Sequence, residues 1–110
     1  MNTKKEKRLP LITPGEVLKE EFLVPLNLTP YRLAKDIETS ATAIGQILAG
    51  TRAITPDMAL RLSTYLGTTA KFWMNLQVNH DLKKAQIQSH KHRDITPYAK
   101  LQKTGGSIGT

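Results

Sequence analysis

The residues of this sequence whose chemistry could recognise another molecule gather in a short segment that begins at Ala41. Its apolar pattern is typical of a helix, and it leaves Thr42, Ala43 and Gln46 facing outward. A glutamine amide can pair with two groups of adenine in the major groove of DNA, and alanine or threonine methyl groups can contact the thymine methyl group. We therefore predict that the outward residues of this helix read bases: Ala41, Thr42, Ala43 and Gln46.

The same helix carries no arginine or lysine, the side chains that make the strongest contacts with guanine. This predicts an A·T-leaning site that is read weakly, with much of the affinity supplied by phosphate contacts. The alternative is that the small residues serve helix packing and read nothing. Polar side chains on both sides of the helix are the candidates for phosphate contacts: Tyr31, Arg32, Lys35, Ser40, Thr51 and Arg52. Each could be an ordinary solvated residue, and their grouping around one helix favours binding.

Catalytic and metal-binding chemistry finds little support in this sequence. The sequence has no cysteine, which excludes thiol catalysis and cysteine-bound zinc. His80 with Asp81, and His90 with His92, are the suggestive groups, and neither has a nucleophile or an acid partner at motif spacing. His80 is expected to pack on the inner side of its helix. We expect no enzyme, no cofactor and no metal.

Composition points to a small basic domain. The chain has 110 residues, with sixteen Lys and Arg against nine Asp and Glu, so its formal net charge is +7. The positive electrostatic field of such a surface favours polyanions, and double-stranded DNA is the first partner to consider. No apolar window reaches the roughly 18 residues that a membrane-spanning helix needs. We expect a cytoplasmic protein without a membrane partner.

Two short helices joined by a tight corner, over residues 31–50, form the centre of the predicted fold. The second helix follows Ser40, whose hydroxyl can cap it, and ends at Gly50, which suits a left-handed C-terminal position. Thr-Pro pairs predict three other helix starts. The predicted helices are 14–24, 30–37, 41–49, 56–66 and one that begins after Thr69 and reaches residue 86 or 87. Pro25 is expected to stop the first of them.

The fifth helix carries two apolar stripes on roughly opposite sides, and one small core can cover only one of them. We therefore predict that the second stripe is a dimer or partner surface: Met74, Val78, Leu82 and Ala85. The alternative is that the C-terminal tail folds back over it. We divide the chain into a basic flexible arm (residues 1–12), an all-α domain that includes the dimerisation helix (13–87), and a polar, disordered tail (88–110).

Three segments, PGEVLKEEFL, ITPDMALRL and KFWMNLQ, carry a more specific signal. Together with the helix pattern over residues 13–82, they resemble the HigA/VapI antidote family, within the lambda-repressor-like helix-turn-helix proteins of the Xre class. The resemblance implies a five-helix domain with a C-terminal helical extension. It also implies DNA-facing roles for Thr42, Ala43, Gln46 and Arg52.

The resemblance further implies an antitoxin of a type II toxin-antitoxin module. Such a protein binds a RelE-like ribonuclease toxin, here expected as a small basic partner, and represses its own operon as a homodimer. A stand-alone regulator without a toxin and a protein-binding adaptor are the alternatives. The sequence departs from the family pattern at the corner, where Glu38 replaces the usual glycine. That position predicts left-handed strain of ~1 kcal/mol, or else a turn of a different build.

Overall fold

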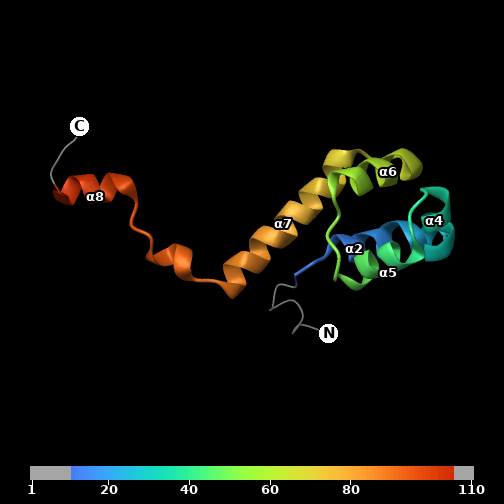
Figure 1. Ribbon diagram of the computed structural model, residues 1–110, viewed down its shortest axis with the longest axis horizontal. Coiled ribbons are helices and arrows are strands. Elements are labelled where there is room, and N and C mark those ends of the chain that lie inside the picture. Colours follow the sequence, from blue (N-terminus) through green and yellow to red (C-terminus); the bar gives the residue numbers. More distant parts are fainter. Residues whose placement is uncertain (1–10, 106–110) are drawn as a thin grey trace.

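A computed structural model describes residues 11–105, and all regular structure in this range is helical (Figure 1). The predicted arm at residues 1–12 therefore lies almost entirely outside the described residues. The elements in chain order are α2 (Pro14–Val17), the π-helix η1 (Leu18–Leu23), α3 (Val24–Leu26), α4 (Pro30–Asp36), α5 (Ala41–Ala49), α6 (Pro56–Leu66), α7 (Ala70–Gln88), the 3-10 helix η2 (Lys91–Asp94) and α8 (Tyr98–Gly105). Within the described residues, no helix is long and apolar enough to cross a membrane.

Hydroxyl caps begin five of the helical segments, as the sequence predicts. In each case the side-chain oxygen accepts a hydrogen bond from the backbone N–H three residues later, which satisfies a donor that the helix leaves unpaired. The capping residues are Thr13, Ser40, Thr29, Thr55 and Thr69. At the first of them, the carboxylate of Glu16 also accepts from the cap's own N–H at 3.1 Å, which completes a capping box.

The first helical segment is longer than predicted. Pro25 does not stop it, because α2, η1 and α3 follow one another without a break to Leu26. Val24 keeps helical φ and ψ angles of −65° and −52° despite the proline after it. The π-helix η1 ends at Leu23, two residues before Pro25, so its altered hydrogen-bond pattern adjoins the place where the proline lacks an N–H. The segment ends at Asn27, whose left-handed φ is 56°.

The core lies where α4, α5, α6 and the start of α7 meet the first helical segment. Trp73 is fully buried at its centre and packs at an angle against Phe22, with ring centroids 5.3 Å apart. Its indole Nε1 donates to the hydroxyl of Thr68 at 2.7 Å, so the polar atom of this large side chain is satisfied. The other fully buried large side chains are Leu18, Leu33, Ile44, Ile47, Ile54 and Leu62. Each contributes about 1.5–3 kcal/mol by leaving water.

Helix α2 approaches α5 closely enough for their backbones to touch. A Cβ atom added to Gly15 would lie 1.9 Å from the carbonyl oxygen of Ile47 and 2.9 Å from the Cα atom of Leu48. Only glycine leaves room for this approach. The contact fixes the position of α5, the helix predicted to read DNA, relative to the rest of the domain.

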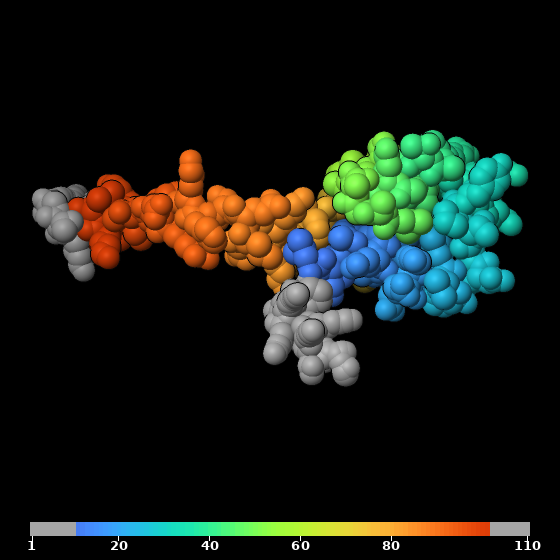
Figure 2. Space-filling view, turned by 90° about the horizontal axis from the view of Figure 1, so that it is seen from below, coloured from blue at the N-terminus to red at the C-terminus, as the bar shows by residue number. Residues whose placement is uncertain are grey.

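The C-terminal part of the chain extends away from this body. Figure 2 shows the later part of α7 and the segments after it as a narrow projection. Every residue from Asp81 to Leu101 is exposed. The described part of the tail contains η2 and α8, so this part of the predicted disordered segment has local helical structure. Disorder of the tail in solution stays a prediction.

Candidate nucleic-acid interface

Helix α5 presents a surface of small and polar side chains. Its cap, Ser40, accepts from the N–H of Ala43 at 3.0 Å, and its C-terminal Gly50 has a left-handed φ of 82°, as the sequence predicts. Ala41 and Thr42 are exposed, and Gln46 is half-buried. All three can therefore reach a molecule that approaches this helix.

The predicted outward orientation of Ala43 is wrong. Its exposed fraction is 6%, and it is buried like Ile44 and Ile47 on the same helix. At 100° per residue, Ala43 lies only about 40° around the helix from Ile47, which places it on the inner face. Ala43 therefore packs in the core and cannot reach a base.

The side chain of Gln46 is in direct contact with Arg52. The Nε of Arg52 donates to the Oε1 of Gln46 at 2.8 Å. The backbone carbonyl of Gln46 also accepts from the N–H groups of Thr51 and Arg52 at 2.9 and 3.2 Å, and from the hydroxyl of Thr51 at 3.3 Å. The chain after Gly50 is thus folded back onto Gln46. Two residues that the sequence predicted separately, one as a base reader and one as a phosphate contact, form a single cluster.

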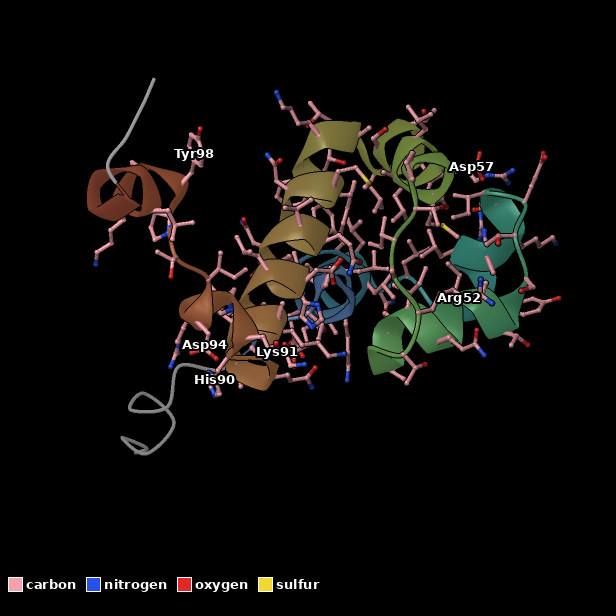
Figure 3. All side chains as sticks on the ribbon, turned by 60° about the vertical axis from the view of Figure 1, so that its left-hand side comes forward. Arg52, Asp57, His90, Lys91, Asp94 and Tyr98 are labelled. Carbon is pink, nitrogen blue, oxygen red and sulfur yellow. The ribbon has the colours of Figure 1, made fainter. Side chains whose placement is uncertain are left out.

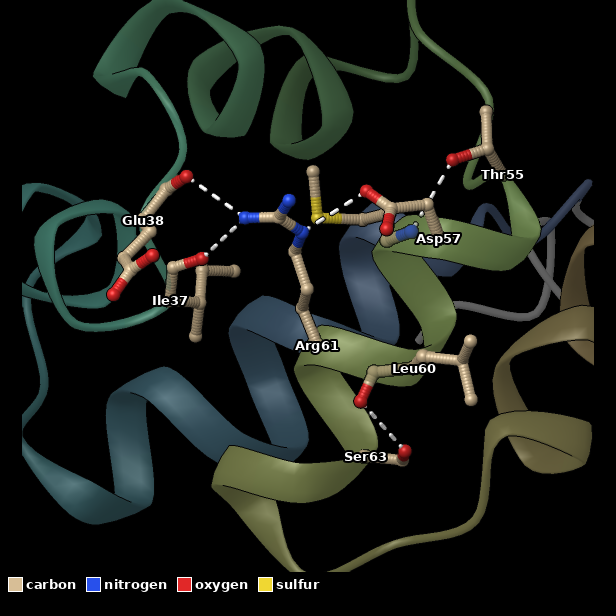
Figure 4. Close-up of polar contacts among 8 residues, drawn as sticks. Ile37, Glu38, Thr55, Asp57, Leu60, Arg61 and Ser63 are labelled. Atoms are coloured by element: carbon tan, nitrogen blue, oxygen red, sulfur yellow. Dashed lines mark hydrogen bonds and ion pairs between the residues drawn. The ribbon is translucent and has the colours of Figure 1, made fainter.

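The corner between α4 and α5 is left-handed, which is the first of the two alternatives that the sequence left open. Glu38 has a φ of 57°, a conformation that non-glycine residues rarely adopt. Figure 4 shows how Arg61 of α6 supports it: one guanidinium nitrogen donates to the carbonyl oxygens of Ile37 and Glu38, both at 2.8 Å, while its Nε binds Asp57 at 2.9 Å. Arg61 is not among the residues predicted from the sequence, and nothing local in the sequence marks it.

On α4, the predicted phosphate contacts Tyr31, Arg32 and Lys35 are all exposed. Arg32 is already paired, since its Nε lies 2.7 Å from the carboxylate of Asp36. Asp36 also accepts a hydrogen bond from the hydroxyl of Tyr65. These two bonds, the one from Tyr65 first, lower the pKa of Asp36 from its ordinary value. A phosphate would therefore compete with Asp36 for Arg32.

A polar residue that the sequence analysis missed holds the loop after α5 in place. Gln77 of α7 has an exposed fraction of 7%, its Oε1 accepts from the N–H of Ile54 at 2.7 Å, and its Nε2 donates to Asp81 at 2.9 Å. The Nδ1 of His80 lies 3.1 Å from the same carboxylate, and this contact is the main cause of the lowered pKa of Asp81. The spacing of Gln77, four residues after Trp73, places it on the inner face of α7 and could have revealed it.

A small polar hollow of about 140 Å³ lies between this loop and α7. Arg52, Gln77, His80, Asp81 and Lys84 are among its lining residues. Over residues 11–105, no group of three or more His, Cys, Asp or Glu side chains could hold a metal ion. The arrangement around α5 therefore offers hydrogen-bond donors and positive charge, a chemistry suited to recognising an anion or a base edge.

The comparisons with known proteins agree with this geometry. The family model for helix-turn-helix domains matches residues 18–73, about half of the chain. Virulence-associated protein I of Dichelobacter nodosus is 42% identical over 89 residues, which span 81% of this chain and 82% of that protein. The chain belongs to the HigA/VapI antidote family of helix-turn-helix proteins.

Solved HigA structures share the fold over about four fifths of this chain. The antitoxin HigA of Pseudomonas aeruginosa, solved with the higBA promoter, is 38% identical, with a TM-score of 0.77 over 81% of this chain and 99% of that chain. An addiction module antidote protein of the HigA family from Coxiella burnetii is 40% identical, with a TM-score of 0.76 over 82% and 100%. The predicted family and the all-α helix-turn-helix fold are confirmed.

Proposed function

We propose that this protein is a sequence-specific DNA-binding repressor that acts as the antitoxin of a type II toxin-antitoxin module and controls its own operon. The observation that supports this most is the cluster of Gln46 and Arg52 at the exposed side of α5, in a chain whose HigA relative was solved with promoter DNA. A repressor works where its operator is, so the proposal includes a cytoplasmic location.

In this proposal α5 is the recognition helix, and its exposed side chains enter the major groove. The base-reading residues are Ala41, Thr42 and Gln46, without the buried Ala43. Phosphates are held by the polar residues at both ends of the motif: Tyr31, Arg32, Lys35, Ser40, Thr51 and Arg52. Ser40 already accepts from a helix N–H, so it would contribute as part of the amide-rich N-terminus of α5.

The proposed homodimer forms through the outer stripe of α7. Val78 and Leu82 have exposed fractions of 55% and 56%, and Ala85 is exposed as well. Met74 is half-buried and packs against the core, so it belongs to the edge of this surface. A two-fold dimer should read two half-sites about one helical turn, ~34 Å, apart. Uneven half-site spacing in a footprint would count against this arrangement.

The proposed toxin partner is a small basic ribonuclease of the RelE type, as the family resemblance implies. Co-expression with a small basic protein encoded beside this gene should give a stable complex and relieve growth arrest. If no such neighbour exists, the chain is a stand-alone regulator.

The experiment that tests DNA binding is a titration of the purified protein with the DNA just upstream of its gene and with a shuffled duplex, at two salt concentrations. We expect preference for the native sequence, weaker binding at higher salt, and a loss of about tenfold for Gln46→Ala on the native duplex. Equally weak binding to both duplexes would refute the repressor and favour a protein-binding adaptor.

A further inference from the structure

The contact between Gln46 and Arg52 determines which hydrogen-bonding groups this surface can offer. Arg52 Nε uses one of the two acceptor positions of Gln46 Oε1, at 2.8 Å. Among the described residues, no protein group accepts from Gln46 Nε2 or from the two terminal nitrogens of Arg52. The pair therefore presents a row of N–H donors with a positive charge beside it.

This geometry is built into the protein before any ligand arrives. Three hydrogen bonds to the carbonyl of Gln46 hold the backbone of Thr51 and Arg52 against the end of α5. Gln77 then anchors the same loop to α7 through the N–H of Ile54. The backbone that carries the two side chains therefore needs little reorganisation on binding.

A donor row of this kind discriminates between bases. In the major groove guanine offers two acceptors, N7 and O6, whereas adenine offers the N7 acceptor beside an N6 donor. To pair with adenine, Gln46 would have to accept from that donor with the second acceptor position of its amide oxygen, beside the guanidinium that occupies the first. The N6 group would then meet a positive charge and competing donors.

We propose that Gln46 and Arg52 act as one base-reading unit that selects guanine, a role that rests on the proposed DNA-binding function and that replaces the phosphate contact predicted for Arg52. Gln46 and Arg52 together supply the guanine-type contact that the sequence analysis found missing from α5. Arg52 sits beyond the end of the helix, in the loop that folds back onto Gln46. The operator therefore carries a guanine in each half-site, at the base pair that lies opposite Gln46 and Arg52.

The test begins with selection of duplexes from a randomised library by the full-length protein. The selected duplex is then titrated by fluorescence anisotropy alongside two altered duplexes. One carries an A·T pair at the guanine position, and the other carries 7-deazaguanine, which lacks the N7 acceptor. The variants are Gln46→Ala, Arg52→Ala, Arg52→Lys and the double alanine variant. Lys91→Ala removes one positive charge far from Arg52 and is the matched control (Figure 3).

We expect the parent and Lys91→Ala to prefer guanine over adenine by about tenfold or more, and to lose affinity for the 7-deaza duplex. Each alanine variant and Arg52→Lys should lose the preference for guanine and the sensitivity to the 7-deaza substitution. The double alanine variant should bind little more weakly than the weaker-binding of the two single alanine variants, because the two residues act together. The opposite pattern, in which Arg52→Ala weakens all duplexes equally and Arg52→Lys restores them, would make Arg52 a phosphate contact and overturn the proposal. An adenine selected at this position would overturn it too. If the parent enriches no sequence at all, DNA reading itself is refuted.

Discussion

Replacing Gly15 with alanine tests the backbone contact that places α5. The new methyl group would lie 1.9 Å from the carbonyl oxygen of Ile47, 2.8 Å from its carbonyl carbon and 2.9 Å from the Cα atom of Leu48. All three are backbone atoms of α5, so no side-chain rotation can relieve the clash. The two helices would have to move apart by roughly 1 Å or more to restore ordinary contact distances.

The size of the effect follows from two opposing contributions. Alanine favours a helix over glycine by about 1 kcal/mol. Overfilling a packed core costs typically 1–3 kcal/mol, and more where the obstacle is rigid. Because the obstacle is backbone, the cost should reach or exceed the upper end of this range. We therefore expect a net loss of about 2 kcal/mol or more in the free energy of unfolding, out of the roughly 5–15 kcal/mol of a typical domain. The midpoint of thermal unfolding should fall by at least about 10 °C.

The assay is urea and thermal unfolding followed by circular dichroism, with Gly45→Ala as the matched control. Gly45 is exposed on α5, and a Cβ atom added there would have no neighbour within 4 Å. The control should gain about 0.5–1 kcal/mol, because glycine loses more conformational freedom than alanine in a helix. If Gly15→Ala unfolds at the same denaturant concentration as the parent, α2 and α5 are not in backbone contact and the reasoning fails.

Three further changes test the hydrogen bonds around the site. Gln77→Leu leaves the buried N–H of Ile54 without its acceptor, so stability should fall by about 1–3 kcal/mol. Amide exchange of Ile54 should also accelerate, and unchanged exchange would contradict the bond. Tyr65→Phe removes the main cause of the lowered pKa of Asp36, so this pKa should rise in an NMR titration. The pKa of Asp36 is lower in the folded state than in the unfolded state. The ionised carboxylate therefore stabilises the fold above the unfolded-state pKa, and this stabilisation is lost as the pH falls through the folded-state pKa. Tyr65→Phe should therefore lose less stability than the parent on acidification. Glu38→Gly should stabilise the protein by up to ~1 kcal/mol by relieving left-handed strain, and a lower unfolding midpoint would refute this.

Local chemistry determined most of the helix boundaries, and the exception is the first helical segment, which continues past Pro25 to Leu26. A cap such as Ser40 and a C-terminal residue such as Gly50 act through bonds that span a few residues, so their effect can be read from neighbouring letters. The left-handed corner at Glu38 is also a local feature, because it concerns only the backbone between two predicted helices. Gln46 and Arg52 could each be predicted as functional, since their residue types and their places beside α5 are visible in the chain.

Tertiary structure decided what those residues do together. Arg61 supports the corner from 24 residues away, and Gln77 reaches the loop after α5 across 23. No periodic pattern encodes such pairs, because they depend on how the helices cross. The error at Ala43 has a different cause, because the spacing of Ala43 from Ile47 already places it on the inner face of α5. The sequence alone therefore predicted which helix carries the candidate base-reading residues. Only the tertiary structure, through the packing of α5 against α2 and α4, decided which of its side chains are exposed.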